Sequence, residues 1–317
     1  MLFCYAVLLI PICFHLVFFV YLNIENFFLA FKEMAFVELD DGKWMYTYKW
    51  ADNNGFANFI RFIEEITGRA DNPVVGNSVR NSFRMWWTNF LISNPLYLIF
   101  SYYVFRKYVG GKAFGILTMV PNIVSGMVFG LCFVQVLKYG LPDAMETLFE
   151  LEEGSFPYLL ATGIDTQNTD LIWGTGIFYL IWLSFGMQVL VLSNAMNAID
   201  NEIFESGRLD GANDRQEFMY IVFPMIWPTF STFLVTGVAS MFTVSGPWLM
   251  FFEWGAPEEV WGFSYWMNRT IKKELAGGES GIMDYPMVAA SGQLVSIASL
   301  PLVFFTRWLT NKLDKTE

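Results

Sequence analysis

Residues 171–192 read LIWGTGIFYLIWLSFGMQVLVL, an apolar stretch without a charged side chain. A helix needs roughly 20 such residues to cross the hydrocarbon core of a bilayer. Other stretches of the chain meet the same requirement, so the sequence predicts an all-α polytopic membrane bundle. Its six predicted transmembrane helices are 2–22, 85–105, 113–137, 171–192, 225–252 and 286–309.

The composition agrees with a protein whose solvent is lipid. Of the 317 residues, 55% are hydrophobic and only 15% are charged. A formal net charge of -11 disfavours nucleic acid as a partner. The only histidine is His15, and the three cysteines lie inside apolar runs. The sequence therefore predicts no metal site, no cofactor and no histidine-based catalytic site.

The charges that flank the central stretch orient the bundle. Residues 138–170, on its N-terminal side, hold one base and seven acids, so we expect this segment outside the cell. The link between the second and third spans carries Arg106, Lys107 and Lys112 without an acid, which is typical of a cytosolic loop. Alternation then places 23–82 and 253–285 outside and 193–224 inside, with both termini in the cytosol.

The connection on the C-terminal side of the central stretch has the pattern of two short helices joined by a turn. Asp200 is placed to cap the first helix. Asp210 and Gly211 form a turn signal, because glycine accepts positive φ. Asn213 and Gln216 have the spacing of a capping box for the second helix.

This connection resembles the EAA loop of binding-protein-dependent ABC permeases, in which EAA is followed by DGA and then by F, I, LP and a further proline. The matching residues are Glu205, Asp210, Gly211, Ala212, Phe218, Ile221, Pro224 and Pro228. Ser206 and Gly207 stand where the family usually has two alanines, and Phe223 replaces leucine. We expect Pro224 to end the second short helix, since proline lacks the backbone N–H.

Shorter matches extend the resemblance along the chain. They are Gly55-Phe56-Ala57-Asn58-Phe59 (GxxNF), Asn81-Ser82 (N-[ST]), Met119-Val120-Pro121 (LPxxI), and Tyr285 with Ala289-Ala290-Ser291 (YG-AAA). Together they point to the carbohydrate branch of the family and to its maltose- or glycerol-phosphate-type first permease.

The resemblance implies a type I importer fold, with 1–317 as a single transmembrane permease domain and its core at about 83–309. It implies a transporter subunit in the bacterial cytoplasmic membrane that is not itself an enzyme. Its implied partners are a second permease subunit, two ATPase subunits and an extracytoplasmic solute-binding protein, and ATP would be hydrolysed on the ATPase subunits. The residues that would couple to the ATPase through the EAA loop are Glu205, Ser206, Gly207, Asp210, Gly211, Ala212, Phe218 and Pro224.

Polar and aromatic residues within the spans are candidates for the substrate pathway, because unpaired polar groups are costly in lipid. They are Asn122, Gln135, Gln188, Ser245, Trp248 and Gln293. The alternative for each polar side chain is a hydrogen bond between packed helices.

Two other functions remain open from the sequence. The EAA loop is shared by importers of many solutes, so the cargo could be glycerol phosphate or another non-sugar solute rather than a carbohydrate. A membrane sensor or scaffold that does not transport is the alternative from another class.

Overall fold

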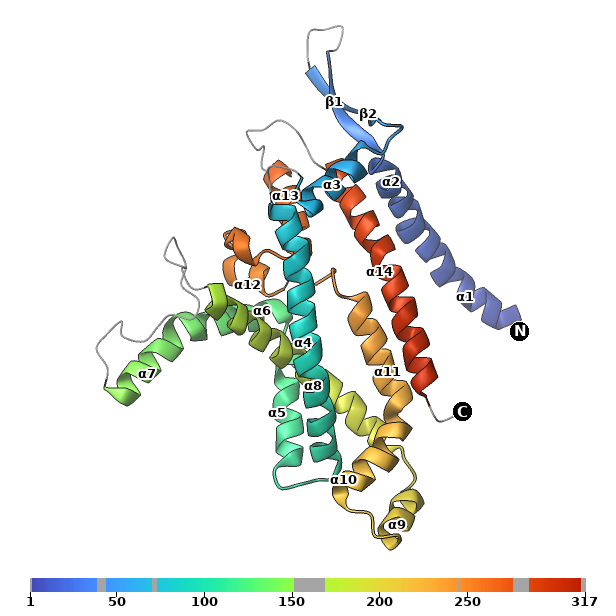
Figure 1. Cartoon of the computed structure of the whole chain (residues 1–317), viewed down its shortest axis with the longest axis vertical. Coiled ribbons are helices and arrows are strands. Elements are labelled where there is room, and N and C mark those ends of the chain that lie inside the picture. Colours follow the sequence, from blue (N-terminus) through green and yellow to red (C-terminus); the bar gives the residue numbers. More distant parts are fainter. Residues whose placement is uncertain are drawn as a thin grey trace. The chain divides into compact units, whose positions relative to one another are not determined.

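The computed structural model describes residues 2–38, 44–69, 73–150, 169–244, 246–275 and 285–314. These residues are mostly helical, as predicted, with one β-hairpin (Figure 1). The chain divides into two compact units. The first comprises Met1–Asn77 and Trp266–Ser299, and the second comprises Ser78–Tyr265 and Leu300–Glu317.

The first unit begins with a long apolar helical segment made of α1 (Leu2–His15), the π-helix η1 (Leu16–Tyr21) and α2 (Leu22–Leu29). An antiparallel hairpin of β1 (Lys32–Glu38) and β2 (Trp44–Trp50) follows, in which Lys32 pairs with Trp50. Then comes α3 (Ala57–Thr67), and parts of α13 (Phe263–Leu275) and α14 (Tyr285–Leu313) complete the unit.

Two of the short sequence matches hold this unit together. The Asn58 amide of α3 donates to the carbonyls of Ala30 and Lys32, at 2.9 and 2.8 Å. Phe59 packs with Ala30 and with Ala290 of α14, and all three are buried. These residues therefore fix α3 against the end of α2 and against α14.

The second unit consists of helices and short connections. They are α4 (Val74–Phe105), α5 (Gly111–Ile123), α6 (Gly126–Gln135), η2 (Val136–Gly140), α7 (Leu141–Phe149), α8 (Thr169–Asn197), α9 (Asn201–Leu209), α10 (Asp214–Gln216), η3 (Glu217–Val222), α11 (Phe223–Ala239), α12 (Trp248–Phe252) and η4 (Glu258–Val260).

The central stretch of the sequence forms α8, which packs closely against α5. A Cβ added at Gly186 would collide with the backbone carbonyl of Thr118, so only glycine permits this approach. On the side toward α4 and α11, Phe185, Val189 and Leu192 of α8 belong to a buried cluster that includes Ile226.

The predicted number of six spans is not confirmed. Four helical stretches in the described part are long and apolar enough to cross a membrane, namely Pro11–Leu29, Thr169–Asn197, Asp214–Ala239 and Tyr285–Leu313. A fifth is obtained if the bent pair Gly111–Ile123 and Gly126–Phe149 counts as one span.

The prediction of one continuous span at 113–137 is wrong, because α5 and the helix that starts at Gly126 meet at 103°. Val124 and Ser125 leave the helical conformation, with ψ angles of 144° and 129°. Pro121 lies within the last turn of α5, where it cannot donate a backbone hydrogen bond. The segment carries no charged side chain, so hydropathy alone does not reveal the bend.

The prediction for 225–252 is also wrong in two respects. The helix ends at Ala239, and Gly246 adopts a φ of +66° before α12 begins at Trp248. At the other end, Pro224 does not stop the helix, which runs from Asp214 to Ala239. The wide turn of η3 accommodates the proline, since the Phe223 N–H bonds to the Phe218 carbonyl five residues back.

Candidate functional site

The predicted two-helix connection is present, and its first helix is α9. The Asp200 carboxylate accepts the Glu202 N–H at 3.2 Å, which confirms the predicted N-cap. Phe204 is 5% exposed and its ring lies 5.5 Å from that of Phe105. The opposite face is open to solvent, with Leu209 89% exposed. The helix thus packs on α4 through one face, and its other face is exposed.

The turn after α9 has the predicted geometry. Gly211 adopts a φ of +83°, and the Ala212 N–H bonds back to the Gly207 carbonyl at 3.0 Å. Asn213 and Gln216 form the predicted capping box, with hydrogen bonds of 3.0 and 2.9 Å. These contacts orient α10 and η3, which continue into α11.

The replacement of the family's second alanine by glycine has a structural reason. A Cβ added at Gly207 would lie 2.6 Å from Cδ1 of Ile221, so the side chain of Ile221 occupies that space. The glycine lets α9 pack closely against η3.

An ion cluster around one buried glutamate ties this loop to the rest of the unit. The Glu217 side chain is 2% exposed and pairs with Nη1 of Arg106 at 3.1 Å and with Nε of Arg208 at 3.3 Å. Arg106 also pairs with Asp214 at 2.5 Å through Nη2. Both arginines pair with the Glu217 carboxylate. Their positive charges compensate the charge of the buried glutamate.

Two tyrosines complete this cluster. The Tyr108 hydroxyl donates to Oδ2 of Asp214 at 2.7 Å, and that of Tyr102 lies 3.4 Å from Oε1 of Glu217. Burial lowers the pKa of Arg106, but the hydrogen bond to Tyr108 and the nearby acids outweigh it, so the net pKa is raised. Arg106 therefore remains a cation, and it joins the α4–α5 turn to α10 and η3, which lie beside it in Figure 1.

Sequence reasoning did not find Glu217. It used Arg106 only to orient the bundle and assigned no role to Arg208. The available signal was a lone acid at the start of the apolar run Phe218–Phe223, where an ionised side chain needs a partner.

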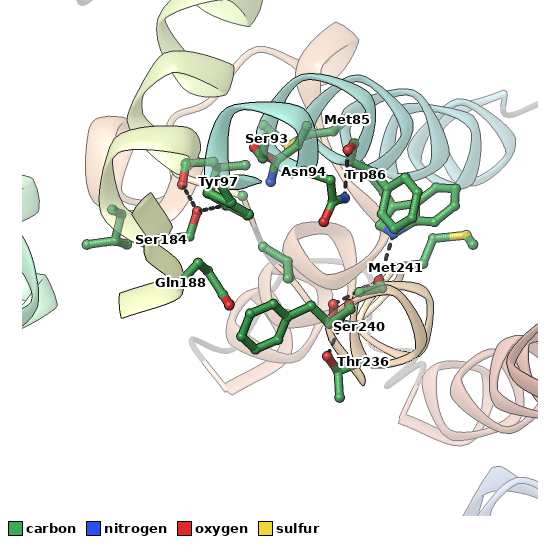
Figure 2. Close-up of a pocket in the computed structure, with 18 of the residues that line it drawn as sticks. Met85, Trp86, Ser93, Asn94, Tyr97, Ser184, Gln188, Thr236, Ser240 and Met241 are labelled. Atoms are coloured by element: carbon green, nitrogen blue, oxygen red, sulfur yellow. Dashed lines mark hydrogen bonds between the residues drawn. The ribbon is translucent and has the colours of Figure 1, made fainter. Parts of the chain in front are cut away.

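A cavity of about 580 Å³ lies within the second unit, mainly between α4, α8 and α11. Figure 2 shows Asn94 and Gln188 reaching toward its middle from two sides. Its polar lining residues in the described part of the chain are Ser82, Asn89, Ser93, Asn94, Tyr97, Asn122, Ser184, Gln188, Thr236 and Ser240. Its larger apolar lining residues include Met85, Trp86, Phe90, Phe233 and Met241.

Hydrogen bonds fix several of these side chains. The Tyr97 and Ser184 hydroxyls lie 2.6 Å apart, and Nε1 of Trp86 donates to the Gly237 carbonyl at 2.7 Å. By contrast, Oε1 of Gln188 is buried and has no hydrogen-bond partner. Hydrogen bonds thus hold several side chains of the cavity wall in place, and one buried acceptor lacks a hydrogen-bond donor.

The structure brings together two of the six predicted pathway residues, Asn122 and Gln188, at this cavity. Gln135 is exposed on α6 and does not line the cavity. Trp248 is fully buried, and its ring contacts that of Trp173 with 5.5 Å between centroids. Gln293 belongs to the first unit, where it donates to the Phe27 carbonyl at 3.0 Å.

Ser245 lies outside the described residues. Sequence reasoning missed the four α4 residues Asn89, Ser93, Asn94 and Tyr97. Asn89, Ser93 and Tyr97 recur every fourth residue, with Asn94 next to Ser93, so they lie on one side of the helix, which was the signal available in the sequence.

Curated relatives of this chain are transport permeases. The multiple sugar-binding transport system permease protein MsmF of Streptococcus mutans is 28% identical over 123 residues, which cover 39% of this chain and 40% of MsmF. The probable starch degradation products transport system permease protein AmyD of Thermoanaerobacterium thermosulfurigenes is 24% identical over 197 residues, covering 62% of this chain and 64% of AmyD. The chain therefore spans about half the length of these relatives.

A solved structure shares the fold over almost the whole chain. It is a chain of a bacterial ABC transporter involved in the import of the acidic polysaccharide alginate. The TM-score is 0.74 at 19% identity, with 99% of this chain and 96% of that chain covered. The family described as binding-protein-dependent transport system inner membrane component matches residues 85–316. This match spans the loop that contains α9 and all lining residues of the cavity except Ser82, and the chain belongs to that family of membrane permeases.

Proposed function

We propose that this chain is one permease subunit of an ABC importer that moves a carbohydrate across the bacterial cytoplasmic membrane. A separate ATPase would drive it through the loop that contains α9. The observation that carries this proposal is a continuous mechanical path from the exposed helix α9 to the cavity wall.

The path begins at the exposed face of α9 and passes through the Arg208–Glu217 ion pair into η3. Helical structure then continues without a break from Asp214 to Ala239. Phe233 and Thr236 of this helix line the cavity. A partner that displaces α9 would therefore also move residues that line the cavity. Binding of the partner can in this way shift the equilibrium between two conformations of the permease.

The exposed side chains near this loop suit a protein partner. Leu209, Met219 and Tyr220 are 89%, 60% and 79% exposed. Exposed apolar side chains at the end of a predicted span favour a protein contact. Glu205, Asp210 and Gly211 are exposed at the same loop and would take part in docking the ATPase.

The family description supports the remaining partners that we propose. A binding-protein-dependent system delivers solute from an extracytoplasmic binding protein, and we propose a second permease subunit and two ATPase subunits in the same complex. With the α4–α5 turn and α9 in the cytosol, residues 138–170 lie outside, as do both hairpin strands, and the termini are cytosolic.

The carbohydrate cargo is supported by the names of the relatives and by the hydroxyl, amide and aromatic groups in the cavity wall. A non-sugar solute such as glycerol phosphate is the alternative within transport. A sensor or scaffold is the alternative outside it.

The test is ATP hydrolysis by the complex purified from native membranes and reconstituted in lipid. We expect ATPase subunits to co-purify with this chain and solute to accelerate hydrolysis. A complex without an ATPase, or hydrolysis that no transported solute changes, would support the sensor or scaffold alternative.

A further inference from the structure

The cavity between α4, α8 and α11 has a mainly apolar wall with several polar side chains, and its described lining is uncharged. None of its lining residues in the described part of the chain is an acid, a base or a histidine. From this, and resting on the import function proposed above, we propose that the cavity binds uncharged oligosaccharides, excludes anionic ones, and uses the Gln188 amide to recognise a sugar hydroxyl.

The strongest indication of a ligand is the unmatched acceptor. Oε1 of Gln188 is shielded from solvent and has no partner, whereas buried acceptors in folded proteins are nearly always hydrogen-bonded. The Gln188 side chain projects into the cavity (Figure 2). No water-sized group reaches Oε1 in this arrangement, so the terminal amide must rotate for a bound solute to satisfy it. A sugar hydroxyl that enters the cavity would then donate to this oxygen.

The opposite wall offers further groups of the same chemistry. The Asn94 amide donates to the Phe90 carbonyl at 2.7 Å, which orients its own oxygen, and Figure 2 shows this amide at the cavity. Thr236 and Ser240 add hydroxyls from the α11 side. Hydroxyls and amides both donate and accept, which matches the alternating donors and acceptors of a polyhydroxy ligand.

The aromatic lining suits the apolar faces of sugar rings. The Trp86 indole is held by its hydrogen bond to the Gly237 carbonyl and packs on Phe90, with 5.1 Å between ring centroids. A volume of about 580 Å³ falls within the range of small-molecule sites. The combination of a fixed aromatic surface with a few polar groups is the usual composition of such sites.

The absence of charge determines the solute class. A carboxylate or phosphate that enters this cavity loses its water and finds no cation on the described wall, so its desolvation is not compensated. The Arg84 guanidinium, on α4, lies 5.1 Å from the centroid of the Trp173 ring and is not part of the lining. The likeness to the alginate importer shows the fold alone, and we infer the opposite charge preference here.

The experiment uses the complete importer in proteoliposomes. It is offered two oligosaccharide libraries of equal chain lengths, one of neutral hexoses and one of uronates, and the internalised sugars are identified by mass spectrometry. We expect only neutral sugars inside. Uptake of uronates would overturn the solute class. Uptake of neither library, by a complex that assembles and hydrolyses ATP, would overturn it as well, and both results would leave the import function standing.

A variant locates the selectivity in this cavity rather than in a binding protein. Gln188→Met keeps the side-chain length and removes the amide, so we expect the half-saturating concentration of the neutral sugar to rise about fivefold to tenfold. Asn194→Leu is the matched control, since it removes an exposed amide of α8 outside the cavity. An unchanged half-saturation in Gln188→Met would contradict the role of this residue. If the unmodified chain did not assemble with an ATPase subunit, that result would instead contradict the proposed function.

Discussion

Removal of the Glu217 carboxylate should release α9 from the α4–α5 turn. Glu217 is the buried centre of the ion cluster, at 3.1 Å from Arg106 and 3.3 Å from Arg208. Breaking a buried ion pair by removing one partner costs about 3–5 kcal/mol. Two features reduce that figure here: Arg106 keeps Asp214 at 2.5 Å, and the Arg208 side chain is 55% exposed and can be hydrated. We therefore expect Glu217→Ala to cost about 2–3 kcal/mol.

The assay measures position as well as stability. Spin labels at Leu209 and Val109, which are 89% and 96% exposed, report the distance between α9 and the α4–α5 turn. We expect Glu217→Ala to broaden this distance distribution and to lower ATPase association, while membrane insertion is unchanged. Glu217→Gln should show a smaller effect, because the amide keeps the volume and one acceptor.

Glu202→Gln serves as the control, since it removes an exposed acid from the same helix. Its distance distribution should match that of the unmodified protein. If Glu217→Ala kept both the narrow distribution and full ATPase association, the ion cluster would not hold the loop, and the proposed mechanical path would be wrong.

The other predictions concern the turn, the helix packing, the orientation and the energy source. Gly211→Val should strain the turn by about 1–3 kcal/mol and abolish solute-stimulated ATPase, whereas Gly211→Asn should retain it, because asparagine tolerates positive φ; equal activity of the two variants would exclude the backbone explanation. Gly186→Ala should destabilise the α5–α8 contact by about 1–3 kcal/mol, because its Cβ meets the Thr118 carbonyl, and an unchanged melting temperature in detergent would contradict this packing. In a variant without native cysteines, an impermeant thiol reagent should label a cysteine at position 150 in intact cells and one at position 109 only after lysis; the reverse pattern would invert the topology. The purified chain without partners should not hydrolyse ATP, and saturable hydrolysis free of contaminating ATPase would contradict the assignment.

Local features of the loop that contains α9 could be predicted because they depend on neighbouring residues. The Asp200 cap, the Asn213–Gln216 capping box and the positive φ of Gly211 each follow from a short pattern, and all are present. The prediction that Pro224 ends the helix is wrong because the π-helix η3 lets the helix continue through the proline. No short sequence pattern predicts such a π-helix.

Features that depend on distant residues could not be predicted. The bend at Val124 lies in a segment without charged side chains, so hydropathy indicates one span where the backbone turns by 103°. Gln135 and Gln188 look alike in the sequence, yet one is exposed on α6 and the other reaches the cavity. The partners of Glu217 include Arg106, which is 111 residues away in the chain.

The central claim is that α9 docks on an ATPase, and site-specific photo-crosslinking tests it most directly. A photoreactive residue replaces Leu209 on α9, and a second variant carries it at Tyr48 of the β-hairpin, which is 42% exposed. In native membranes that retain uptake, we expect the Leu209 position to cross-link to an ATP-binding protein, with a yield that changes when ATP is added, and the Tyr48 position not to do so. Cross-linking to no ATP-binding protein from position 209, in membranes where uptake continues, would contradict the account.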